Sequence, residues 1–309
     1  MTEKQSTEMD ITARQEQKNA LENGCLAIGQ EMVYREEKTD GEMKIRTITD
    51  EVVQYVFEND WFNPELEICI TAVFDGNRAL LIDAGYSKQA EELKAYFDKL
   101  GVTVEMILLS HYHPDHTEGA HVFKAPRLIA SRQYHANYIM CSQNWDTAGT
   151  YAIPNDIFDE GDEFSFGVHQ IRIVGSGGHC RCSVMLHIDE TFIHLGDLLM
   201  KDIAGDITFP CISRDGSIGG YLSSFKHLES HTDAIALLAH GSPIHLREAK
   251  VLLAENAAYF ERLTHCTDSR FSEEVRAAYI SKGWSFSKWH DINLKFTRKP
   301  ILKDETDEI

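Results

Sequence analysis

The sequence lacks the features of a membrane or secreted protein. No stretch approaches the roughly 18 consecutive apolar residues that a membrane-spanning helix needs, and the first residues are polar and charged, without the apolar core of a secretory signal. The seven cysteines are an odd number without a framework of regular spacings, which suits a reducing compartment. We therefore expect a cytoplasmic protein that does not bind membranes.

Basic residues are also scarce. Against 49 acidic residues the chain has 30 lysines and arginines, and its formal net charge is −19. No cluster of basic residues accompanies the histidine-rich segments. Because proteins that bind nucleic acids contact the phosphates through Lys and Arg, the sequence predicts a small-molecule substrate and no nucleic-acid partner.

The most distinctive segment reads His-Tyr-His-Pro-Asp-His and begins at His111. His111 and His113 are two residues apart, so in an extended segment their side chains point to the same side. Pro114 disfavours the helical conformation for His113 and prolongs that segment. Asp115 and His116 are consecutive and must point in different directions. Three imidazoles and one carboxylate in so short a run indicate a site for two adjacent divalent metal ions.

Further His and Asp residues follow short apolar runs that are typical of buried strands. Loops at strand ends often carry metal and catalytic groups, because the strand fixes their position. Glycine, which allows tight turns and close backbone approach, flanks most of these residues. The residues are Asp83, His179, Asp197 and His240.

In this order the motifs resemble those of the metallo-β-lactamase-fold hydrolases, a superfamily that includes glyoxalase II, quorum-quenching lactonases and β-lactamases. These motifs cover about the middle half of the chain. The resemblance implies an α/β fold, an αββα sandwich with the metal site at one edge of its two sheets. One departure is the run Gly-His-Cys-Arg at His179, where the family often has Gly-His-Thr-Pro-Gly.

The resemblance also implies a role for each ligand. One metal ion would be held by His111, His113 and His179. The other would be held by Asp115, His116 and His240. Asp197 would bridge both ions, and Asp83 would orient a ligand imidazole through a hydrogen bond.

Imidazole nitrogen and carboxylate oxygen suit zinc, and also iron or manganese. We expect two Zn²⁺ ions with a bridging hydroxide, because two cations strongly lower the pKa of water. The hydroxide would attack a thioester, lactone or other ester, with Asp115 orienting it or accepting its proton. Because β-lactamases commonly lack the bridging Asp, Asp197 favours the glyoxalase II and lactonase side of the superfamily.

Three other functions stay open. A mononuclear iron persulfide dioxygenase of the same superfamily uses the first three histidines and tolerates the rest of the motif. A phosphodiesterase is disfavoured by the acidic composition. A catalytically silent ligand-binding member is disfavoured because every metal ligand is present.

Four side chains are candidates for contact with the substrate or its reacting atoms. Tyr221 opens a segment with helical spacing and is a candidate catalytic phenol. Arg214 precedes a turn and could bind a carboxylate. Trp145 and Tyr151 lie in residues 131–157, which either cover the site as a lid or form a surface excursion.

The remaining potential ligands are interpreted as structural. Cys180 and Cys182 have a Cys-x-Cys spacing that is not usual for zinc sites, so we expect them to pack beneath the site. Ten further histidines, among them His187, His227 and His231, lack a second partner at metal spacing in the sequence. We expect each of them to be packed or solvated.

The chain divides into three parts. Residues 1–43 are a polar N-terminal arm, and residues 44–263 form the metallo-β-lactamase-fold domain. Residues 264–309 contain several aromatic residues, so this C-terminal extension should either pack on the domain or form a homodimer contact. Alternating strands and helices, including a helix over 87–100 with a Ser cap and a Gly end, predict α/β layers.

Overall fold

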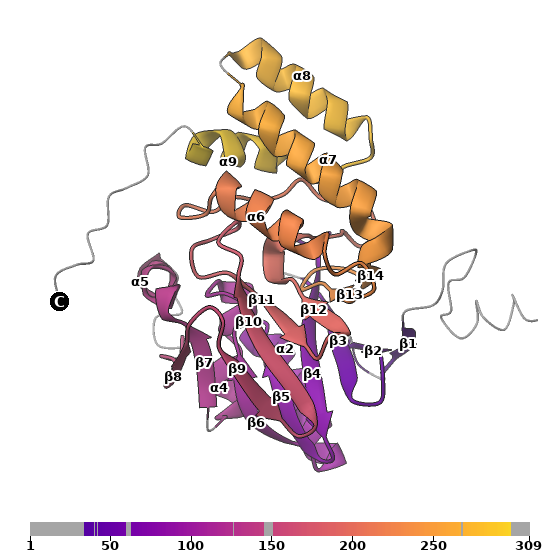
Figure 1. The fold of residues 1–309 in the computed structure, drawn as a ribbon. Coiled ribbons are helices and arrows are strands. Elements are labelled where there is room, and N and C mark those ends of the chain that lie inside the picture. Colours follow the sequence, from indigo (N-terminus) through magenta and orange to yellow (C-terminus); the bar gives the residue numbers. More distant parts are fainter. Residues whose placement is uncertain are drawn as a thin grey trace, which may run out of the picture.

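Two β-sheets pack face to face, and helices cover both outer faces (Figure 1). This computed structural model describes residues 34–39, 41, 43–59, 63–125, 127–144, 151–266 and 268–297. The predicted αββα sandwich is confirmed. Of the helices in these ranges, none combines the length and the apolar character that crossing a bilayer requires.

The first sheet has eight strands in the order of the chain. Pairing is antiparallel from β1 to β5 and parallel from β5 to β8. The strands are β1 (Arg35–Lys38), β2 (Lys44–Thr47), β3 (Val52–Glu58), β4 (Glu67–Asp75), β5 (Arg78–Ile82), β6 (Thr103–Leu108), β7 (Arg127–Ser131) and β8 (Asp156–Phe158). The first sheet thus begins as a meander and ends as a parallel array.

The second sheet has six strands in the order β14-β13-β12-β11-β10-β9. Only the β12–β13 pair is parallel. The strands are β9 (Glu163–Phe166), β10 (His169–Gly175), β11 (Val184–Ile188), β12 (Phe192–His194), β13 (Ile235–Leu237) and β14 (Ile244–His245).

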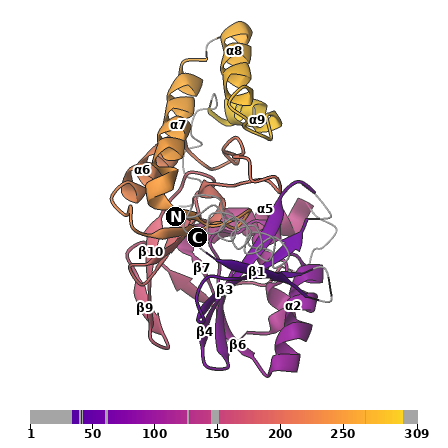
Figure 2. The ribbon, with the colours of Figure 1, turned by 90° about the vertical axis from the view of Figure 1, so that its right-hand side faces the viewer.

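Helices lie on both outer faces of the sandwich. In Figure 2, α2 lies on the outer side of the first sheet, away from β9 and β10, while α6 and α7 lie at the opposite side of the molecule. The helices are α2 (Ser87–Leu100), α3 (Pro114–Thr117), α4 (Ala120–Phe123), the 3-10 helix η1 (Arg132–Tyr134), α5 (His135–Asn144), the 3-10 helix η2 (Gly196–Leu198), α6 (Ile218–Leu228), α7 (Leu246–Thr264), α8 (Ser269–Ile280) and α9 (Lys288–Thr297).

Alternation of side chains along the strands produces three hydrophobic clusters. In β5, Leu80 and Ile82 join the cluster between the sheets, whereas Leu81 joins the cluster that includes α2. In β11, Leu186 faces the first sheet, whereas Met185 joins the cluster that includes α6 and α7. The sequence therefore builds four layers, because each sheet buries both of its faces.

The helix over 87–100 was predicted with its observed bounds. Gly101 ends it in the left-handed conformation, with φ of 70°, which glycine adopts without strain. The predicted Ser cap was wrong by one residue. Tyr86 is the N-cap, and its backbone N–H donates to the side chain of Gln89 at 2.9 Å.

The N-terminal part of the chain differs from the prediction. Residues 35–38, which we assigned to an arm, form β1 and pair with β2 at the edge of the first sheet. All four residues of this strand are charged, so the strand has no alternation of apolar and polar residues that could signal it locally, and the pairing with β2 defines it. Residues 1–33 lie outside the described residues.

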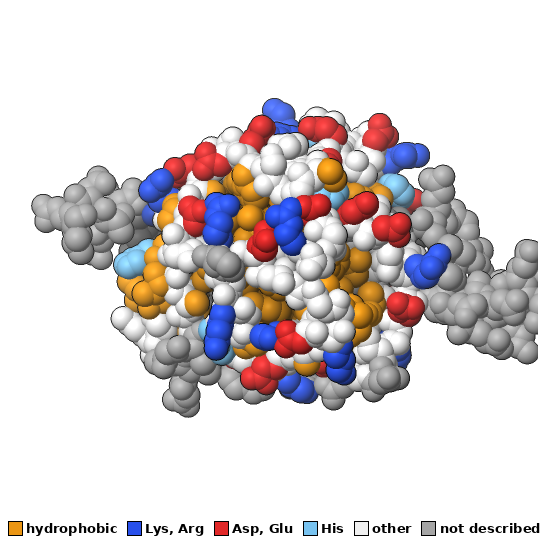
Figure 3. Space-filling model, turned by 90° about the horizontal axis from the view of Figure 1, so that it is seen from below, with side chains coloured by type: hydrophobic (Ala, Val, Ile, Leu, Met, Phe, Trp, Pro, Cys, Tyr) orange, Lys and Arg blue, Asp and Glu red, His pale blue; other side chains and the backbone are white. Residues whose placement is uncertain are grey.

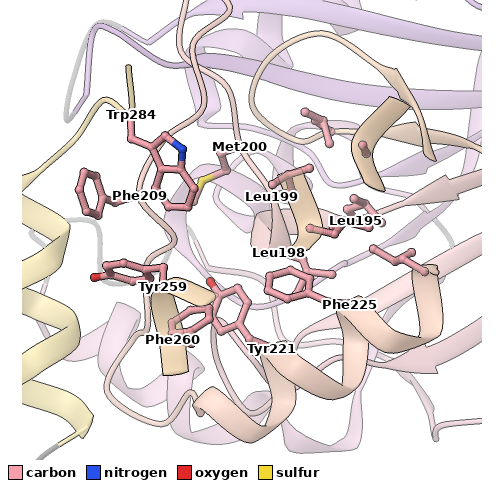
Figure 4. Packing of buried hydrophobic residues seen from close by; sticks show 14 of the residues in the cluster. Leu195, Leu198, Leu199, Met200, Phe209, Tyr221, Phe225, Tyr259, Phe260 and Trp284 are labelled. Atoms are coloured by element: carbon pink, nitrogen blue, oxygen red, sulfur yellow. The ribbon is translucent and has the colours of Figure 1, made fainter. Parts of the chain in front are cut away.

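The described part of the C-terminal extension packs on the domain. The ring centroid of Trp284 lies 5.5 Å from that of Phe209, and Tyr279 lies 5.1 Å from Tyr259 of α7. Figure 4 shows the aromatic cluster in which several of these side chains meet. Asn293 of α9 also donates a hydrogen bond to a backbone carbonyl of the domain, at 2.7 Å. The homodimer contact stays a prediction.

Acidic and basic side chains alternate on the face of the molecule shown in Figure 3, with apolar patches between them. On this face the Lys and Arg side chains do not gather into a stripe. The charge distribution there offers no continuous basic track along which a phosphate backbone could lie.

Candidate metal centre

Five segments bring their polar side chains to the same edge of the sandwich. The loop after β5 carries Asp83, and the loop after β6 leads into α3 with four of the predicted ligands. The loops after β10, β12 and β13 carry His179, Asp197 and His240. Backbone hydrogen bonds join the two sheets here, from Val184 to Ser110 and from Cys69 to Ala239, each at 2.9 Å. The ligands therefore lie where the sheets meet.

The first group of ligands, called here the all-histidine group, consists of His111, His113 and His179. His113 Nδ1 lies 3.1 Å from His111 Nε2 and 2.9 Å from His179 Nε2. His113 has the predicted extended backbone before Pro114, with φ of −112° and ψ of 160°. Three ring nitrogens thus converge on one point.

The second group, called here the mixed group, consists of Asp115, His116 and His240. His116 Nε2 lies 3.7 Å from Asp115 Oδ1, and His240 Nε2 lies 3.5 Å from Asp115 Oδ2. Asp115 and His116 both belong to the single turn of α3, whereas His240 follows β13. This group therefore contains a carboxylate that the all-histidine group lacks.

Asp197 lies between the two groups. Its Oδ2 is 3.8 Å from His111 Nε2 and 3.5 Å from His179 Nε2. Its Oδ1 is 3.2 Å from the Nε2 atoms of both His116 and His240. One carboxylate oxygen therefore faces each group, which is the arrangement that a bridging ligand requires.

Backbone carbonyls orient two of the ligand imidazoles from outside. His179 Nδ1–H donates to the carbonyl of Cys211 at 2.6 Å, and His240 Nδ1–H donates to the carbonyl of Glu67 at 2.7 Å. A carbonyl only accepts, so Nδ1 carries the proton in both rings. The Nε2 lone pair of each ring is therefore directed into the site.

Asp83 links one histidine of each group through hydrogen bonds. Its Oδ2 accepts from His116 Nδ1 at 2.8 Å and from the Ser110 hydroxyl at 2.7 Å, and that hydroxyl lies 3.1 Å from His111 Nδ1. Burial alone would raise the pKa of Asp83, but the contacts with His116 outweigh it and hold the pKa below its usual value. Its φ of 63° is uncommon for a residue with a side chain and is held by these bonds.

The two groups differ in electrostatics. Burial, with neighbouring imidazoles, lowers the pKa of His111 and His113 well below its usual value. Burial would also lower the pKa of His116 and His240, but Asp197 outweighs it and raises both. Burial would raise the pKa of Asp197, yet the surrounding imidazoles, His116 first, hold it well below the usual range.

The residues present fit a pair of divalent ions. Among the described residues, Asp197 Oδ1 and His116 Nε2 have no hydrogen-bond partner although both are buried, and buried polar atoms are normally satisfied. Zinc–nitrogen distances of about 2.0–2.1 Å place neighbouring ligands of a tetrahedral site about 3.3 Å apart. The nitrogen separations of 2.9 and 3.1 Å at His113 are close to that value.

Tyr221 does not reach this site as a free phenol. The side chain is fully buried, and its ring centroid lies 4.7 Å from that of Phe260 (Figure 4). Its hydroxyl donates to the carbonyl of Cys211 at 2.8 Å. The predicted substrate contact is therefore wrong, because Tyr221 lies on the buried face of α6 and packs in the hydrophobic core. Since the same carbonyl accepts from His179, Tyr221 acts as a positioning residue.

Arg214 belongs to a segment whose backbone contacts His179. It is exposed, and it belongs to a turn that packs on the backbone of His179, where the Ser213 N–H donates to the His179 carbonyl at 2.8 Å. A Cβ added at Gly216 would lie 2.1 Å from the same carbonyl, so only glycine allows the turn to approach so closely. The contact of Arg214 with a substrate stays a prediction.

The described part of residues 131–157 supports the metal-binding loop from beneath. Asn137 of α5 donates to Cys182 Sγ at 3.3 Å, and the Tyr112 hydroxyl donates to the carbonyl of Ala152 at 2.6 Å. Tyr151 is 6% exposed and belongs to the cluster of Tyr112. The contact of Tyr151 with a substrate stays a prediction.

Trp145 lies outside the described residues. Its predicted contact with the apolar part of a substrate stays a prediction.

Sequence reasoning missed one phenol beside the metal centre. Tyr86 is half-buried, and burial raises the pKa of its hydroxyl, with further contributions from Asp115, Glu118, Tyr151 and Asp197. Its phenol is thus close enough to the ligand carboxylates to feel their charge. In the sequence, only its position three residues after Asp83 could have indicated that Tyr86 lies near the metal centre.

The two cysteines near His179 pack as expected. Of the four groups of potential ligands formed by the described residues, none contains a cysteine. Cys180 and Cys182 are buried with their sulfurs 3.5 Å apart, and Cys182 Sγ accepts from the Tyr112 N–H at 3.3 Å. Burial, above all, raises the pKa of Cys180 well above its usual value, so its thiol stays protonated.

Comparison with known proteins shows distant relatives. The chain is 25% identical to glyoxylase B2 of Dictyostelium discoideum over 150 residues, covering 46% of this chain and 51% of that protein. It is 24% identical to a hydroxyacylglutathione hydrolase of Brucella anthropi over 269 residues, covering 84% of this chain and 92% of that protein. The chain thus spans about half of the first relative and nearly all of the second.

Solved structures share the fold. A metallo-β-lactamase family protein from Thermus thermophilus has a TM-score of 0.61 at 17% identity, covering 82% of this chain and 94% of that one. A metallo-beta-lactamase from Pontibacter korlensis has a TM-score of 0.57 at 18% identity, covering 71% and 99%. The model of the metallo-beta-lactamase superfamily matches residues 69–240, more than half of the chain and all of its candidate ligands. The chain therefore belongs to the metallo-β-lactamase superfamily.

Proposed function

We propose that this protein is a hydrolase that uses two Zn²⁺ ions to cleave a small acyl substrate, a thioester, lactone or other ester. The observation that carries the proposal is the position of Asp197, whose two oxygens face different ligand groups at 3.2–3.8 Å. A carboxylate shared in this way suits two ions better than one. Iron or manganese fits the same donor atoms.

The chain's own residues divide the work. Bound divalent ions would supply a water molecule of lowered pKa and polarise the substrate carbonyl. The imidazoles of both groups would hold the ions and take no part in proton transfer. The Asp115 side chain is 23% exposed, against 9% for Asp197, so Asp115 is the carboxylate that can accept a proton and release it to solvent.

The substrate class is supported by two considerations. The Brucella anthropi relative is named a hydroxyacylglutathione hydrolase and aligns along most of this chain, which favours a glutathione thioester. The net charge of −19 repels polyanions at long range, although screening over about 8 Å at physiological salt weakens this effect. Arg214, which is exposed, is the anchor that we propose for a single substrate carboxylate.

The complete mixed group also bears on the alternatives. A mononuclear iron persulfide dioxygenase needs only one metal ion, and Asp115, His116 and His240 would then have no ion to hold. Their ligand atoms nonetheless lie within 4.8 Å of one another. Metal analysis separates the two functions, because about two zinc ions bound at the candidate metal centre with ester hydrolysis support the proposal, and about one iron bound there with oxygen uptake contradicts it.

The test is a substrate panel with the zinc-loaded protein. It contains a lactone, a glutathione thioester, a β-lactam and bis-p-nitrophenyl phosphate, and His113→Ala serves as the inactive control. We expect the highest kcat/KM for the thioester or the lactone. If the phosphodiester gives the highest kcat/KM by about tenfold or more, the acyl-hydrolase proposal is wrong, since that factor corresponds to about 1.4 kcal/mol in transition-state binding.

A further inference from the structure

A second cluster of histidines shares no residue with the candidate metal centre. His187 of β11, His227 of α6 and His231 beyond the end of α6 bring their ligand atoms within 4.8 Å of one another. The sequence analysis found no partner at metal spacing for these residues, whereas the fold brings the three side chains together. The separation of four residues between His227 and His231, one helical turn, was the signal available in the sequence.

The distances in the cluster resemble those in the all-histidine group. His187 Nε2 and His227 Nε2 are 3.0 Å apart, against 2.9 and 3.1 Å for the nitrogen pairs at His113. The ring of His231 completes the cluster, with its centroid 4.9 Å from His187 and 4.5 Å from His227. Nitrogens this close approach the separation of about 3.3 Å expected between neighbouring ligands of one tetrahedral zinc ion.

Hydrogen bonding directs the His231 ring toward the cluster. His231 Nδ1–H donates to the carbonyl of His227 at 2.9 Å, and a carbonyl only accepts. The proton is therefore on Nδ1, and the lone pair of Nε2 is free to bind a cation. His179 and His240 have the same arrangement, with Nδ1–H on a backbone carbonyl. Such outer bonds are typical of metal-binding histidines.

Packing brings the three rings together and leaves two of them partly exposed to solvent. Side chains alternate along β11, so His187 lies on the same face as Met185, which packs in the cluster with α6. His187 is buried, whereas His227 and His231 are half-buried. The cluster is therefore anchored in the fold at one ring and reachable from solvent at the other two.

Arg172 competes with an ion there. Its guanidinium lies 3.2 Å from His187 Nδ1 and only donates, so without an ion the proton of His187 is on Nε2. Binding an ion through Nε2 requires that proton to move to Nδ1 and Arg172 to swing away. The Arg172 side chain is 33% exposed and has Glu163 within 3.9 Å, so it has an alternative partner.

We propose that His187, His227 and His231 form an additional metal site for a divalent transition ion such as Zn²⁺, which ties the end of α6 to β11. The ion would have three imidazole ligands and water in the remaining position. His227 follows Tyr221 by six residues on α6, or about 9 Å along the helix axis. Because Tyr221 positions His179 through the Cys211 carbonyl, an ion at this site would steady the helix that supports the metal centre.

The test measures zinc bound per chain. The full-length protein, His231→Gln and the control His265→Gln are dialysed to equilibrium against micromolar Zn²⁺ and analysed by mass spectrometry of the metal. His265 is exposed at the end of α7 and stands apart from the cluster. We expect His231→Gln to bind one zinc ion fewer than the wild type, with His265→Gln unchanged. Equal zinc content in all three overturns the proposal.

Two further measurements keep the result independent of folding and of catalysis. The rise in Tm when Zn²⁺ is added to the metal-depleted chain should be smaller in His231→Gln than in the wild type, and an equal rise overturns the proposal. Arg172→Ala removes the competing donor and should bind the additional ion more tightly. Loss of that ion in Arg172→Ala would show that the cluster is only a hydrogen-bonded network.

Discussion

The two halves of the candidate metal centre both contain histidines but differ in charge. In the all-histidine group, burial lowers the pKa of His111 and His113, so these imidazoles are neutral donors. In the mixed group, the carboxylate of Asp197 outweighs burial and raises the pKa of His116 and His240. Protons therefore compete with a cation more strongly in the mixed group than in the all-histidine group. Metal binding and proton release are coupled in the mixed group.

Asp197→Asn should have the largest effect, because it removes the charge that distinguishes the two groups. The amide keeps the shape but leaves two cations without a shared anion. We expect turnover to fall by about 10²–10³-fold, in line with the several kcal/mol that metal-ion catalysis contributes. Metal analysis should show that the mixed group loses its ion first. Two ions still bound tightly at this centre, with wild-type turnover, would rule out a bridging role.

His113→Ala and Asp115→Ala remove one ligand from each half. Each change should lower turnover by about 10²-fold, since ligand loss costs several kcal/mol of transition-state stabilisation. Zinc analysis at limiting metal then separates them, because His113→Ala should bind its remaining ion through the mixed group and Asp115→Ala through the all-histidine group. The exposed His135 offers a matched control as His135→Ala. Activity close to wild type in either ligand variant would contradict the assignment.

Asp83→Asn should weaken both halves together. Asp83 accepts from His116 directly and reaches His111 through the Ser110 hydroxyl. Loss of such outer contacts typically costs about 10–100-fold in metal affinity or activity. Zinc competition with a chelator measures the affinities, and Asp98→Asn on the exposed face of α2 is the control. A change confined to one ion would show that Asp83 orients only one group.

Acidification should separate the two ions. The raised pKa of His116 and His240 means that protons compete for the mixed group from near neutral pH downward. The lowered pKa of His111 and His113 means that protons compete for the all-histidine group only at lower pH. As the pH falls we expect loss of about one zinc ion from the mixed group before the all-histidine group loses its ion, with up to about tenfold weaker binding per pH unit and proton. Loss of both ions at one pH would contradict the comparison.

Cys180→Ser and Cys182→Ser should have the smallest effect on the site. Their sulfurs pack against the metal-binding loop and do not belong to either ligand group. We expect turnover to change by less than about twofold and stability to fall by about 1 kcal/mol, as is typical of a point substitution. Zinc content and thermal unfolding check both values. Loss of an ion in either variant would make the thiol a ligand.

The ligand set could be read from the sequence because metal coordination needs particular side chains at local spacings. His111, His113 and His116 follow β6 within a few residues of one another, and Pro114 keeps His113 extended. The remaining ligands follow apolar runs that form strands, so their position at one sheet edge follows from the fold class. Helix 87–100 was equally local, since its periodicity and Gly101 define it.

Other features depended on partners far away in the chain. Residues 35–38 form a strand only because β2 pairs with them. The sequence indicated Tyr221 as a candidate phenol and did not single out Tyr86, because the position of each hydroxyl depends on packing. The hydroxyl of Tyr221 is held by the Cys211 carbonyl in the core, while Tyr86 lies within the field of Asp115.

By itself, the sequence determined the fold family, the seven candidate metal ligands and the order in which they follow the strands, because these depend on residue types and short spacings. Only the tertiary structure decided which oxygen of Asp197 faces which group, and that His187 of β11 meets His227 of α6 and His231 beyond the end of that helix. Side-chain direction and long-range contact depend on how the layers pack. That packing is a property of the whole chain, and no segment of it specifies the result alone.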